Sequence, residues 1–235
     1  MSDALMMSLD VGYRALVIGA SGGIGRALAD QLAEDGNCEK LVRLSRRVDG
    51  LDITDEASIQ TVAAELGRQE FDLILCATGA LSIGGVGPEK SIKQISSEAM
   101  MAQFALNAVG PALVLKHFAP LLAKRRRAIM GFLSARVGSI GDNALGGWIS
   151  YRSSKAALNQ IVHTAAIEVA RAAPASTIVA IHPGTVMTSL SDPFSAGHQR
   201  FEPNDAAHRI LKMLDGLQPC DTGRFFAYDG TAIPW

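Results

Sequence analysis

A glycine-rich turn directly after a short apolar run is the feature that most constrains the fold of this chain. Residues 15–20 read ALVIGA, without the polar alternation of a strand that is exposed on one face. Residues 24–35 then place apolar side chains at helical spacing. Between them, residues 19–25 read GASGGIG, with the spacing Gly-x-x-x-Gly-x-Gly. A strand that turns so sharply into a helix needs glycine, because side chains would block both the turn and an approaching ligand.

The position of this turn predicts a site for a pyrophosphate. The first N–H groups of a helix are free and carry a partial positive charge, which favours an anion. Because the turn follows the first strand, a dinucleotide site is favoured over a plain strand-to-helix connection. The residues predicted to line the phosphates are Gly19, Ser21, Gly23, Ile24 and Gly25.

Strands and helices alternate along the rest of the chain. Strand-like runs occupy residues 40–44, 71–76, 128–133, 176–182 and 224–228. Four further helical patterns follow: one begins near residue 54, two span residues 99–122 and 150–172, and one begins at residue 202. This alternation predicts an α/β fold, a single Rossmann-type domain over residues 1–235 with a doubly wound parallel sheet of about seven strands. Pro111 is expected to kink or divide its helix, and the long connections 80–91 and 186–201 are expected to be functional.

Composition argues against several other classes of protein. Hydrophobic residues make up 48% of the chain, enough for a large core. The net charge is −1, which gives no support to a nucleic-acid or membrane-surface binder, and the basic run at residues 124–127 is expected to end a helix. Three cysteines without a CxxC pair, and scattered histidines, predict no disulfide framework and no metal site. No signal sequence and no apolar stretch of about 18 residues is found, so we expect a cytoplasmic protein.

The end of the second strand indicates which dinucleotide is bound. An acid at this place often binds the ribose 2′-hydroxyl, whereas this chain has Ser45, Arg46 and Arg47. Either arginine can pair with a 2′-phosphate, and Ser45 can add a hydroxyl. We therefore expect NADP(H) rather than NAD(H). Asp52, at the next turn, is a candidate for the adenine edge or a residue that leads into the next helix.

Tyr151 and Lys155 form the clearest acid–base pair. Their i, i+4 spacing places both side chains on one face of a helix. A phenol has an ordinary pKa near 10, and a nearby ammonium is expected to lower it. Such a tyrosine can donate a proton to a carbonyl oxygen or accept one in reverse.

The glycine turn, the Tyr151/Lys155 pair and Pro183-Gly184 together resemble the short-chain dehydrogenase/reductase family. Within that family, residues 134–151 are most similar to the sniffer-type carbonyl reductases and the C-factor-like proteins. The resemblance implies that Asn107 is an active-site residue that holds a water, and that Lys155 also binds the nicotinamide ribose. It further implies a set of cofactor contacts at Ala77, Thr78, Gly79, Pro183, Gly184 and Thr188.

One position departs from the family pattern. Where relatives carry a serine that polarises the substrate carbonyl, this chain has Ala135, which offers no hydroxyl. Ser134 and Ser139 are the neighbouring candidates to replace it, and the sequence does not choose between them.

The expected activity is reversible NADP(H)-dependent reduction of a small aldehyde or ketone, with a carbonyl compound as the small-molecule partner and a homodimer or homotetramer as the assembly. The alternative is a cofactor-binding signalling or sensor protein with little or no turnover, which Ala135 and the C-factor resemblance motivate. A scaffold that binds no cofactor is the third possibility.

Overall fold

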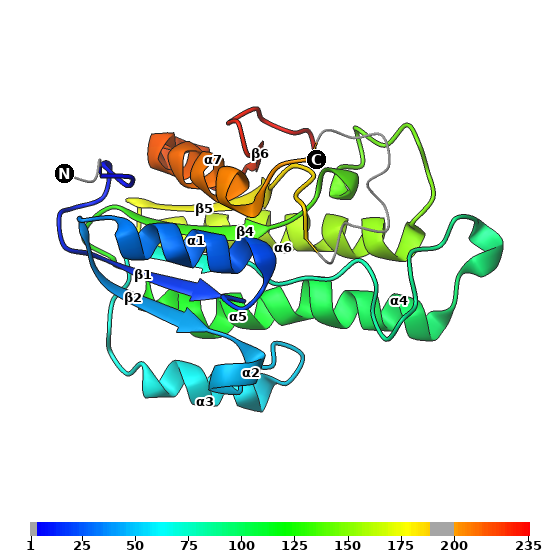
Figure 1. Ribbon diagram of the computed structural model, residues 1–235, viewed down its shortest axis with the longest axis horizontal. Helices are drawn as coiled ribbons and strands as arrows, with labels where there is room; N and C mark the ends of the chain where they lie inside the picture. Colours follow the sequence, from blue (N-terminus) through cyan, green and yellow to red (C-terminus); the bar gives the residue numbers. More distant parts are fainter. Residues whose placement is uncertain (1–3, 189–199) are drawn as a thin grey trace.

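Six parallel strands form one sheet in the order β2-β1-β3-β4-β5-β6 in the computed structural model, which describes residues 4–188 and 200–235 (Figure 1). The strands are β1 Tyr13–Ile18, β2 Cys38–Leu44, β3 Leu73–Cys76, β4 Ala128–Leu133, β5 Ser176–His182 and β6 Phe225–Ala227. The chain leaves β1 for β2 on one side and then returns to β3 on the other. The carboxyl ends of β1 and β3 therefore flank the point where strand order reverses, which is where open α/β sheets bind ligands.

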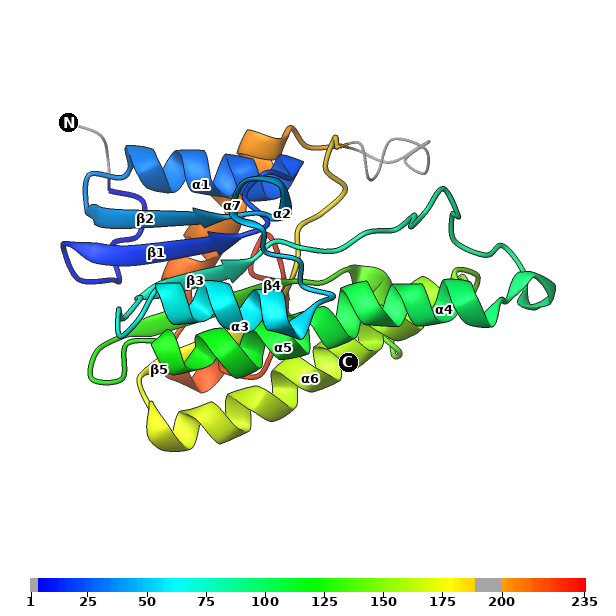
Figure 2. The ribbon, with the colours of Figure 1, turned by 90° about the horizontal axis from the view of Figure 1, so that it is seen from below.

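Helices cover both faces of this sheet. They are α1 Gly23–Glu34, α2 Arg46–Asp49, α3 Glu56–Glu65, α4 Ser97–Phe104, α5 Gly110–Phe118, α6 Ile149–Ala172 and α7 Pro203–Gly216. Short 3-10 turns lie at Ile92–Gln94, Ala119–Leu121, Arg136–Gly138 and Pro219–Asp221. Helices α1 and α7 pack on one face, and α3, α5 and α6 pack on the other (Figure 2).

The two faces explain why the strands lack polar alternation. In β1, Leu16 and Ile18 pack in the layer with α3, α5 and α6, whereas Ala15 and Val17 pack in the layer with α1 and α7. Both sets are buried, so every position favours an apolar side chain. The predicted α/β fold with a parallel sheet is confirmed, and β4 and β5 begin and end at the predicted residues.

The sheet has six strands in the described residues rather than about seven. Residues 50–55, between α2 and α3, contain no strand, and Ile53 and Thr54 form a turn. The Leu51 N–H donates to the Ser45 carbonyl at 3.3 Å, and the Asp52 N–H donates to the Ser58 hydroxyl at 2.8 Å. Each of the six runs predicted as strands corresponds to one of the six strands, and β2 lies at the edge of the sheet.

The predicted helix over residues 99–122 is interrupted before Pro111. Helix α4 passes into a π-helical segment, Ala105–Val109, and α5 begins at Gly110 with Pro111 in its first turn. By length and composition alone, the stretch Ser97–Leu121 is apolar enough to cross a membrane. Val114 and Phe118 are fully buried against the other core side chains, and a core helix meets the same criterion.

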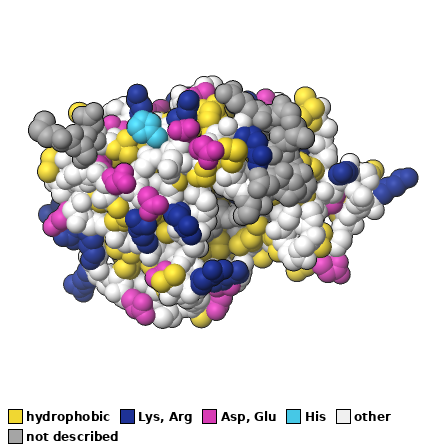
Figure 3. Space-filling view, in the orientation of Figure 1, with side chains coloured by type: hydrophobic (Ala, Val, Ile, Leu, Met, Phe, Trp, Pro, Cys, Tyr) yellow, Lys and Arg dark blue, Asp and Glu magenta, His cyan; other side chains and the backbone are white. Residues whose placement is uncertain are grey.

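Charged side chains of both signs lie on the visible face of the molecule. Figure 3 shows Lys and Arg interspersed with Asp and Glu on the face of the molecule in view. The basic run at residues 124–127 does not end a helix, because the last helical turn stops at Leu121. Within the run, Arg126 pairs with Asp72, and Arg127 donates to the carbonyl oxygen of Leu217. These bonds connect the start of β4 to neighbouring segments.

The predicted loop 186–201 is described only at its two ends, and residues 189–199 lie outside the described part of the chain. The Met187 N–H donates to the Phe201 carbonyl at 2.8 Å, and the Phe201 N–H donates to the Thr185 carbonyl at 2.9 Å. The two ends of the loop are thus held together by backbone hydrogen bonds.

Candidate functional site

The glycine turn lies at the carboxyl end of β1, against the end of β3. Gly19 has a φ of +86°, and a Cβ there would lie 2.8 Å from the Ala77 carbonyl oxygen. A Cβ on Gly25 would lie 2.2 Å from the Gly19 carbonyl oxygen. Both approaches are too close for any side chain, so these glycines let β1, β3 and α1 meet at one point.

The start of α1 fits the pyrophosphate of a dinucleotide. Its N-cap is Gly22, no side chain caps the helix, and no acidic residue lies in its first turn. The first N–H groups and the positive end of the helix dipole are therefore available to an anion. Ser21 and Gly23 are exposed beside this helix end, and Ile24 is half-buried. A Cβ on Gly23 would meet the Thr188 methyl at 2.7 Å, so the segment after β5 reaches the same turn.

The end of β2 presents both basic and acidic groups. Ser45 is buried, and its N–H and hydroxyl donate to the Asp49 carboxylate at 2.7 and 3.2 Å. The Arg46 side chain is 79% exposed and lies 3.8 Å from the Asp52 carboxylate. Hydrogen bonds from Thr54 hold the pKa of Asp52 below its ordinary value. An arginine is thus available to a 2′-phosphate, but Asp49 already occupies the donors of Ser45.

Three predicted site residues converge at the carboxyl end of β3. Gly79 follows β3 with a φ of +140°. A Cβ there would lie 2.9 Å from Asn107 Oδ1 and 3.0 Å from Lys155 Nζ. Three separate elements, the end of β3, the π-helical segment and α6, therefore meet here. They bring Gly79, the Asn107 amide and the Lys155 ammonium so close that no side chain fits at position 79. Ala77 and Thr78, the other predicted contacts on this segment, precede Gly79 and are half-buried.

Asn107 is completely buried in the π-helical segment. Its Oδ1 accepts from the Ala80 N–H, and its Nδ2 donates to the Ala80 carbonyl, both at 2.9 Å. Nδ2 also donates to Gln103 Oε1 at 2.6 Å. Asn107 thereby holds the segment after β3 in place. Single π turns within helices often occur at functional sites.

Tyr151 and Lys155 lie on the buried face of α6, close to its start. Tyr151 is 8% exposed and Lys155 is 3% exposed. Lys155 Nζ donates to the Leu133 carbonyl at 3.0 Å and lies 6.0 Å from the centre of the Tyr151 ring. Burial lowers the pKa of Lys155 to about 8, because the ammonium is removed from water.

The pKa of Tyr151 is raised, not lowered as the Tyr-x-x-x-Lys spacing suggested. The cause is burial, since a phenolate loses more by leaving water than a phenol does. The ammonium of Lys155 is bonded to a main-chain carbonyl rather than to the phenol oxygen. In this arrangement the lysine does not offset the burial of the tyrosine.

Both serines that could replace the missing hydroxyl are engaged elsewhere. The Ser134 hydroxyl donates to Asn159 Oδ1 at 2.6 Å, inside the core. The Ser139 hydroxyl donates to the Pro234 carbonyl at 2.5 Å and accepts from the Asp142 N–H at 3.0 Å. Ala135, between them, is half-buried with an extended backbone.

The segment after β5 contributes the remaining predicted contacts. Gly184 has a φ of +82°, and a Cβ there would lie 3.0 Å from the Tyr228 ring. Pro183 and Gly184 are half-buried and lead toward Thr188. Among residues 4–188 and 200–235, no group of three or more His, Cys, Asp or Glu side chains is arranged to hold a metal ion.

Two polar residues of the site were missed by the sequence analysis. Asp49 bonds to Ser45, and Gln103 bonds to Asn107 while donating to the Leu81 carbonyl at 2.9 Å. Both stand four residues from the group that they contact. Helical spacing from each predicted site residue is the signal that would have found them.

Comparison with known proteins shows the family of this chain. A model of the family "short chain dehydrogenase" matches residues 13–199. The 1-hydroxy-2-glutathionyl-2-methyl-3-butene dehydrogenase of Rhodococcus sp. (strain AD45) is 30% identical over 232 residues, covering 94% of this chain and 98% of that protein. The C-signal protein of Myxococcus xanthus is 34% identical over 137 residues, covering 58% of this chain and 78% of that protein.

Two solved structures share the fold. NADPH-bound carbonyl reductase from chicken fatty liver superposes with a TM-score of 0.82 at 24% identity, covering 100% of both chains. The carbonyl reductase Sniffer of D. melanogaster gives a TM-score of 0.77 at 20% identity, covering 96% of this chain and 100% of that one.

Proposed function

The chain belongs to the short-chain dehydrogenase family, and on that premise we propose that it is an NADP(H)-dependent oxidoreductase that interconverts a small aldehyde or ketone and its alcohol. The observation that carries the proposal is the meeting of Gly79, Asn107 and Lys155 at the end of β3. Beside it, the glycine turn offers the helix end that a pyrophosphate needs.

In the proposed mechanism, Tyr151 transfers the proton. A reduced nicotinamide, when bound, supplies hydride to the carbonyl carbon. Tyr151 donates its phenolic proton to the carbonyl oxygen, which completes the alcohol, and it regains a proton from solvent. The phenol is protonated at neutral pH, and because burial raises its pKa it is a weak acid, so the proton moves only as negative charge develops on the carbonyl oxygen. In the reverse direction the same oxygen must accept a proton, so oxidation of the alcohol is favoured at high pH.

Lys155 and Asn107 prepare the site for this step. Lys155 does not lower the pKa of Tyr151 at rest, but its ammonium, 6.0 Å from the centre of the Tyr151 ring, attracts the negative charge that forms when the phenol gives up its proton. Its hydrogen bond to the Leu133 carbonyl holds the ammonium in the site, where a Cβ on Gly79 would lie only 3.0 Å away. Asn107 holds the backbone of Ala80 through two hydrogen bonds and so keeps this side of the site rigid.

Ala135 makes this a slow enzyme on the proposed mechanism. The missing hydroxyl removes one hydrogen-bond donor from the carbonyl oxygen. By comparison with an oxyanion-hole donor, this loss costs roughly 10²- to 10³-fold in rate. The hydroxyls of Ser134 and Ser139 would have to leave their present acceptors to compensate.

NADP(H) is the proposed cofactor because Arg46 is exposed at the end of β2. The NADPH-bound carbonyl reductase with the same fold supports this choice. Asp49 works against it, since a carboxylate beside Ser45 repels a 2′-phosphate. The proposal of NADP(H) therefore requires that the attraction of Arg46 for a 2′-phosphate exceeds the repulsion by Asp49.

The rival function is a cofactor-binding signalling or sensor protein with little turnover, which Ala135 and the similarity to C-signal favour. The experiment begins with calorimetric titration of NADPH, NADP⁺, NADH and NAD⁺. A panel of carbonyl compounds is then tested for NADPH oxidation by the wild type and by Tyr151→Phe. Oxidation that depends on Tyr151 supports the reductase, whereas binding without any such turnover supports the sensor. Failure to bind any dinucleotide would refute both.

A further inference from the structure

Trp148 has a strained backbone directly before the catalytic helix. It is the N-cap of α6, with φ 53° and ψ 39°. Among the described residues it is the only one other than glycine with a positive φ. Bulky side chains rarely adopt this conformation, and residues held in it cluster at ligand-binding sites.

A buried carboxylate from a distant loop holds this strained turn. Glu89 is 7% exposed, and its main-chain oxygen accepts from the Trp148 N–H at 2.6 Å. Its carboxylate accepts from the Ser150 N–H at 3.3 Å and from the Ser150 hydroxyl. Trp148 itself supplies no capping side chain to α6. Glu89 therefore does for this helix what an N-cap side chain ordinarily does.

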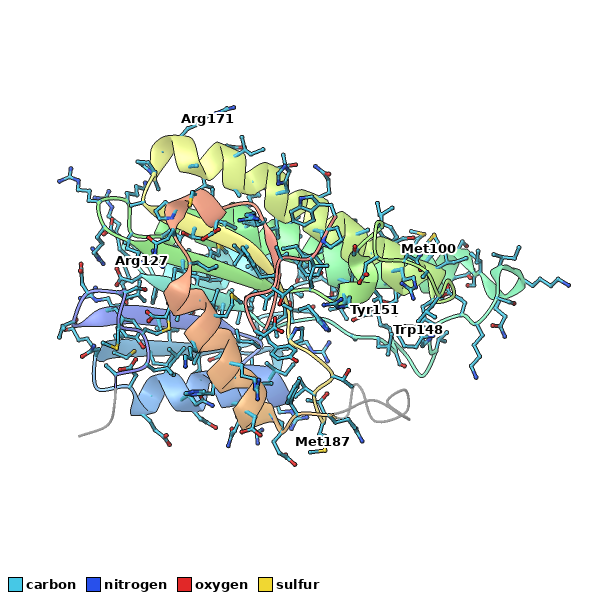
Figure 4. The ribbon with its side chains drawn as sticks, turned by 90° about the horizontal axis from the view of Figure 1, so that it is seen from above. Met100, Arg127, Trp148, Tyr151, Arg171 and Met187 are labelled. Atoms are coloured by element: carbon cyan, nitrogen blue, oxygen red, sulfur yellow. The ribbon has the colours of Figure 1, made fainter. Side chains whose placement is uncertain are left out.

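The strained backbone sets the indole beside the proposed proton donor. The rings of Trp148 and Tyr151 are 6.5 Å apart, edge to face at 67°. Figure 4 shows the two residues next to each other at the start of α6. Trp148 is half-buried, whereas Tyr151 is buried. Part of the surface of Trp148 is therefore accessible, and its ring contacts the phenol ring of Tyr151.

We propose that Trp148 determines substrate specificity by packing against an aromatic substituent on the carbonyl compound, and that Glu89 is the residue that positions it. The inference rests on the proposed reductase function and names its substrate class as aryl aldehydes and ketones. A rigid indole offers a large apolar surface, and aromatic pairs gain beyond the area that they bury. Because the two rings are 6.5 Å apart, a carbonyl compound whose oxygen meets the Tyr151 hydroxyl would bring its substituent toward the indole.

The test compares benzaldehyde with propanal as substrates, using the ratio of their kcat/KM values. This ratio is insensitive to losses that affect both substrates equally. Trp148→Gly and Trp148→Asn remove the indole, and both residues tolerate the left-handed backbone, so these variants are expected to fold. We expect the ratio to fall about 10-fold in both, and to stay within about threefold of wild type in Trp148→Phe. An unchanged ratio in folded, active Trp148→Gly would overturn the inference and leave the reductase intact.

Glu89 is tested with its conservative variant. Glu89→Ala removes the acceptor of Ser150 and should lower the ratio as Trp148→Gly does, although the indole is still present. Glu89→Gln keeps an oxygen acceptor and should retain most of the ratio. A merely structural role would lower kcat/KM for both aldehydes alike and leave the ratio unchanged, which would refute the positioning role.

Failure of the reductase proposal gives a different result. If the wild type turns over neither aldehyde, benzaldehyde is titrated by calorimetry into the NADPH-loaded protein. Saturable binding that is lost in Trp148→Gly supports the aromatic site without the activity. Absence of binding in the wild type, or equal binding in the variant, refutes the aromatic site as well.

Discussion

Replacing Lys155 with methionine should stabilise the protein at neutral pH, although the lysine is proposed to be needed for turnover. The Lys155 side chain is almost entirely buried, and burial lowers its pKa from the ordinary 10.5 to about 8. At pH 7 the amine is therefore still protonated. The folded protein carries the cost of a buried ammonium, which the unfolded chain exposes to water.

The shift in pKa sets the size of this cost. The difference of about 2.5 units corresponds to roughly 3 kcal/mol, at about 1.4 kcal/mol per unit. Between pH 8 and 10.5 the unfolded chain binds more protons at this site, so the wild-type free energy of unfolding rises with pH there. Below pH 8 both states are protonated, and the cost is fully present. Methionine removes the charge and also the hydrogen bond to Leu133, worth about 1 kcal/mol.

The expected gain for Lys155→Met is therefore roughly 2 kcal/mol at pH 7, and it disappears near pH 10. Urea denaturation of both proteins at pH 7, 8, 9 and 10, without added dinucleotide, measures the difference. The exposed Lys212 supplies the control, because Lys212→Met removes a positive charge without removing a buried one. A Lys155→Met variant that is less stable at pH 7, or a difference that is the same at every pH, would refute the argument.

Further predictions concern catalysis, cofactor choice and the fold. Tyr151→Phe should lower turnover by at least about 10²-fold with unchanged NADPH binding, and undiminished activity would falsify the proton-donor role. Arg46→Ala should lower the affinity for NADPH about 10-fold more than the affinity for NADH, whereas Asp49→Asn should raise the affinity for NADPH. Equal changes in the affinities for both dinucleotides, measured by calorimetry, would contradict this. Ala135→Ser should raise kcat about 10-fold or more, and a rate at or below wild type would exclude the missing hydroxyl as the limit. Gly25→Ala should cost more than about 2 kcal/mol in urea denaturation, because its Cβ would lie 2.2 Å from a carbonyl oxygen; normal stability would show that the turn can shift.

Local patterns in the sequence were sufficient for the order of the elements. The apolar runs that become β4 and β5, and the glycine turn before α1, each depend on residues close together in the chain. A run without polar alternation means burial on both faces wherever it lies in a sheet. The parallel α/β fold and the family follow from such patterns.

Contacts between distant segments were decided only by the tertiary structure. The bond between Glu89 and Ser150 joins residues 61 apart, and the approach of Gly79 to Asn107 and Lys155 brings together three elements. Spacing along the chain could not supply these neighbours, because they depend on how separate elements pack against one another.

The pKa of Tyr151 most clearly separates what the sequence determined from what the tertiary structure decided. The spacing to Lys155 determined that both side chains share one face of a helix. The direction in which the pKa of the phenol shifts depends on burial and on the position of the Lys155 ammonium. The core removes Tyr151 from water, and the Leu133 carbonyl at the end of β4 holds Lys155. Sequence therefore determined which groups are present at the site, and packing decided their protonation, because desolvation depends on every segment that covers them.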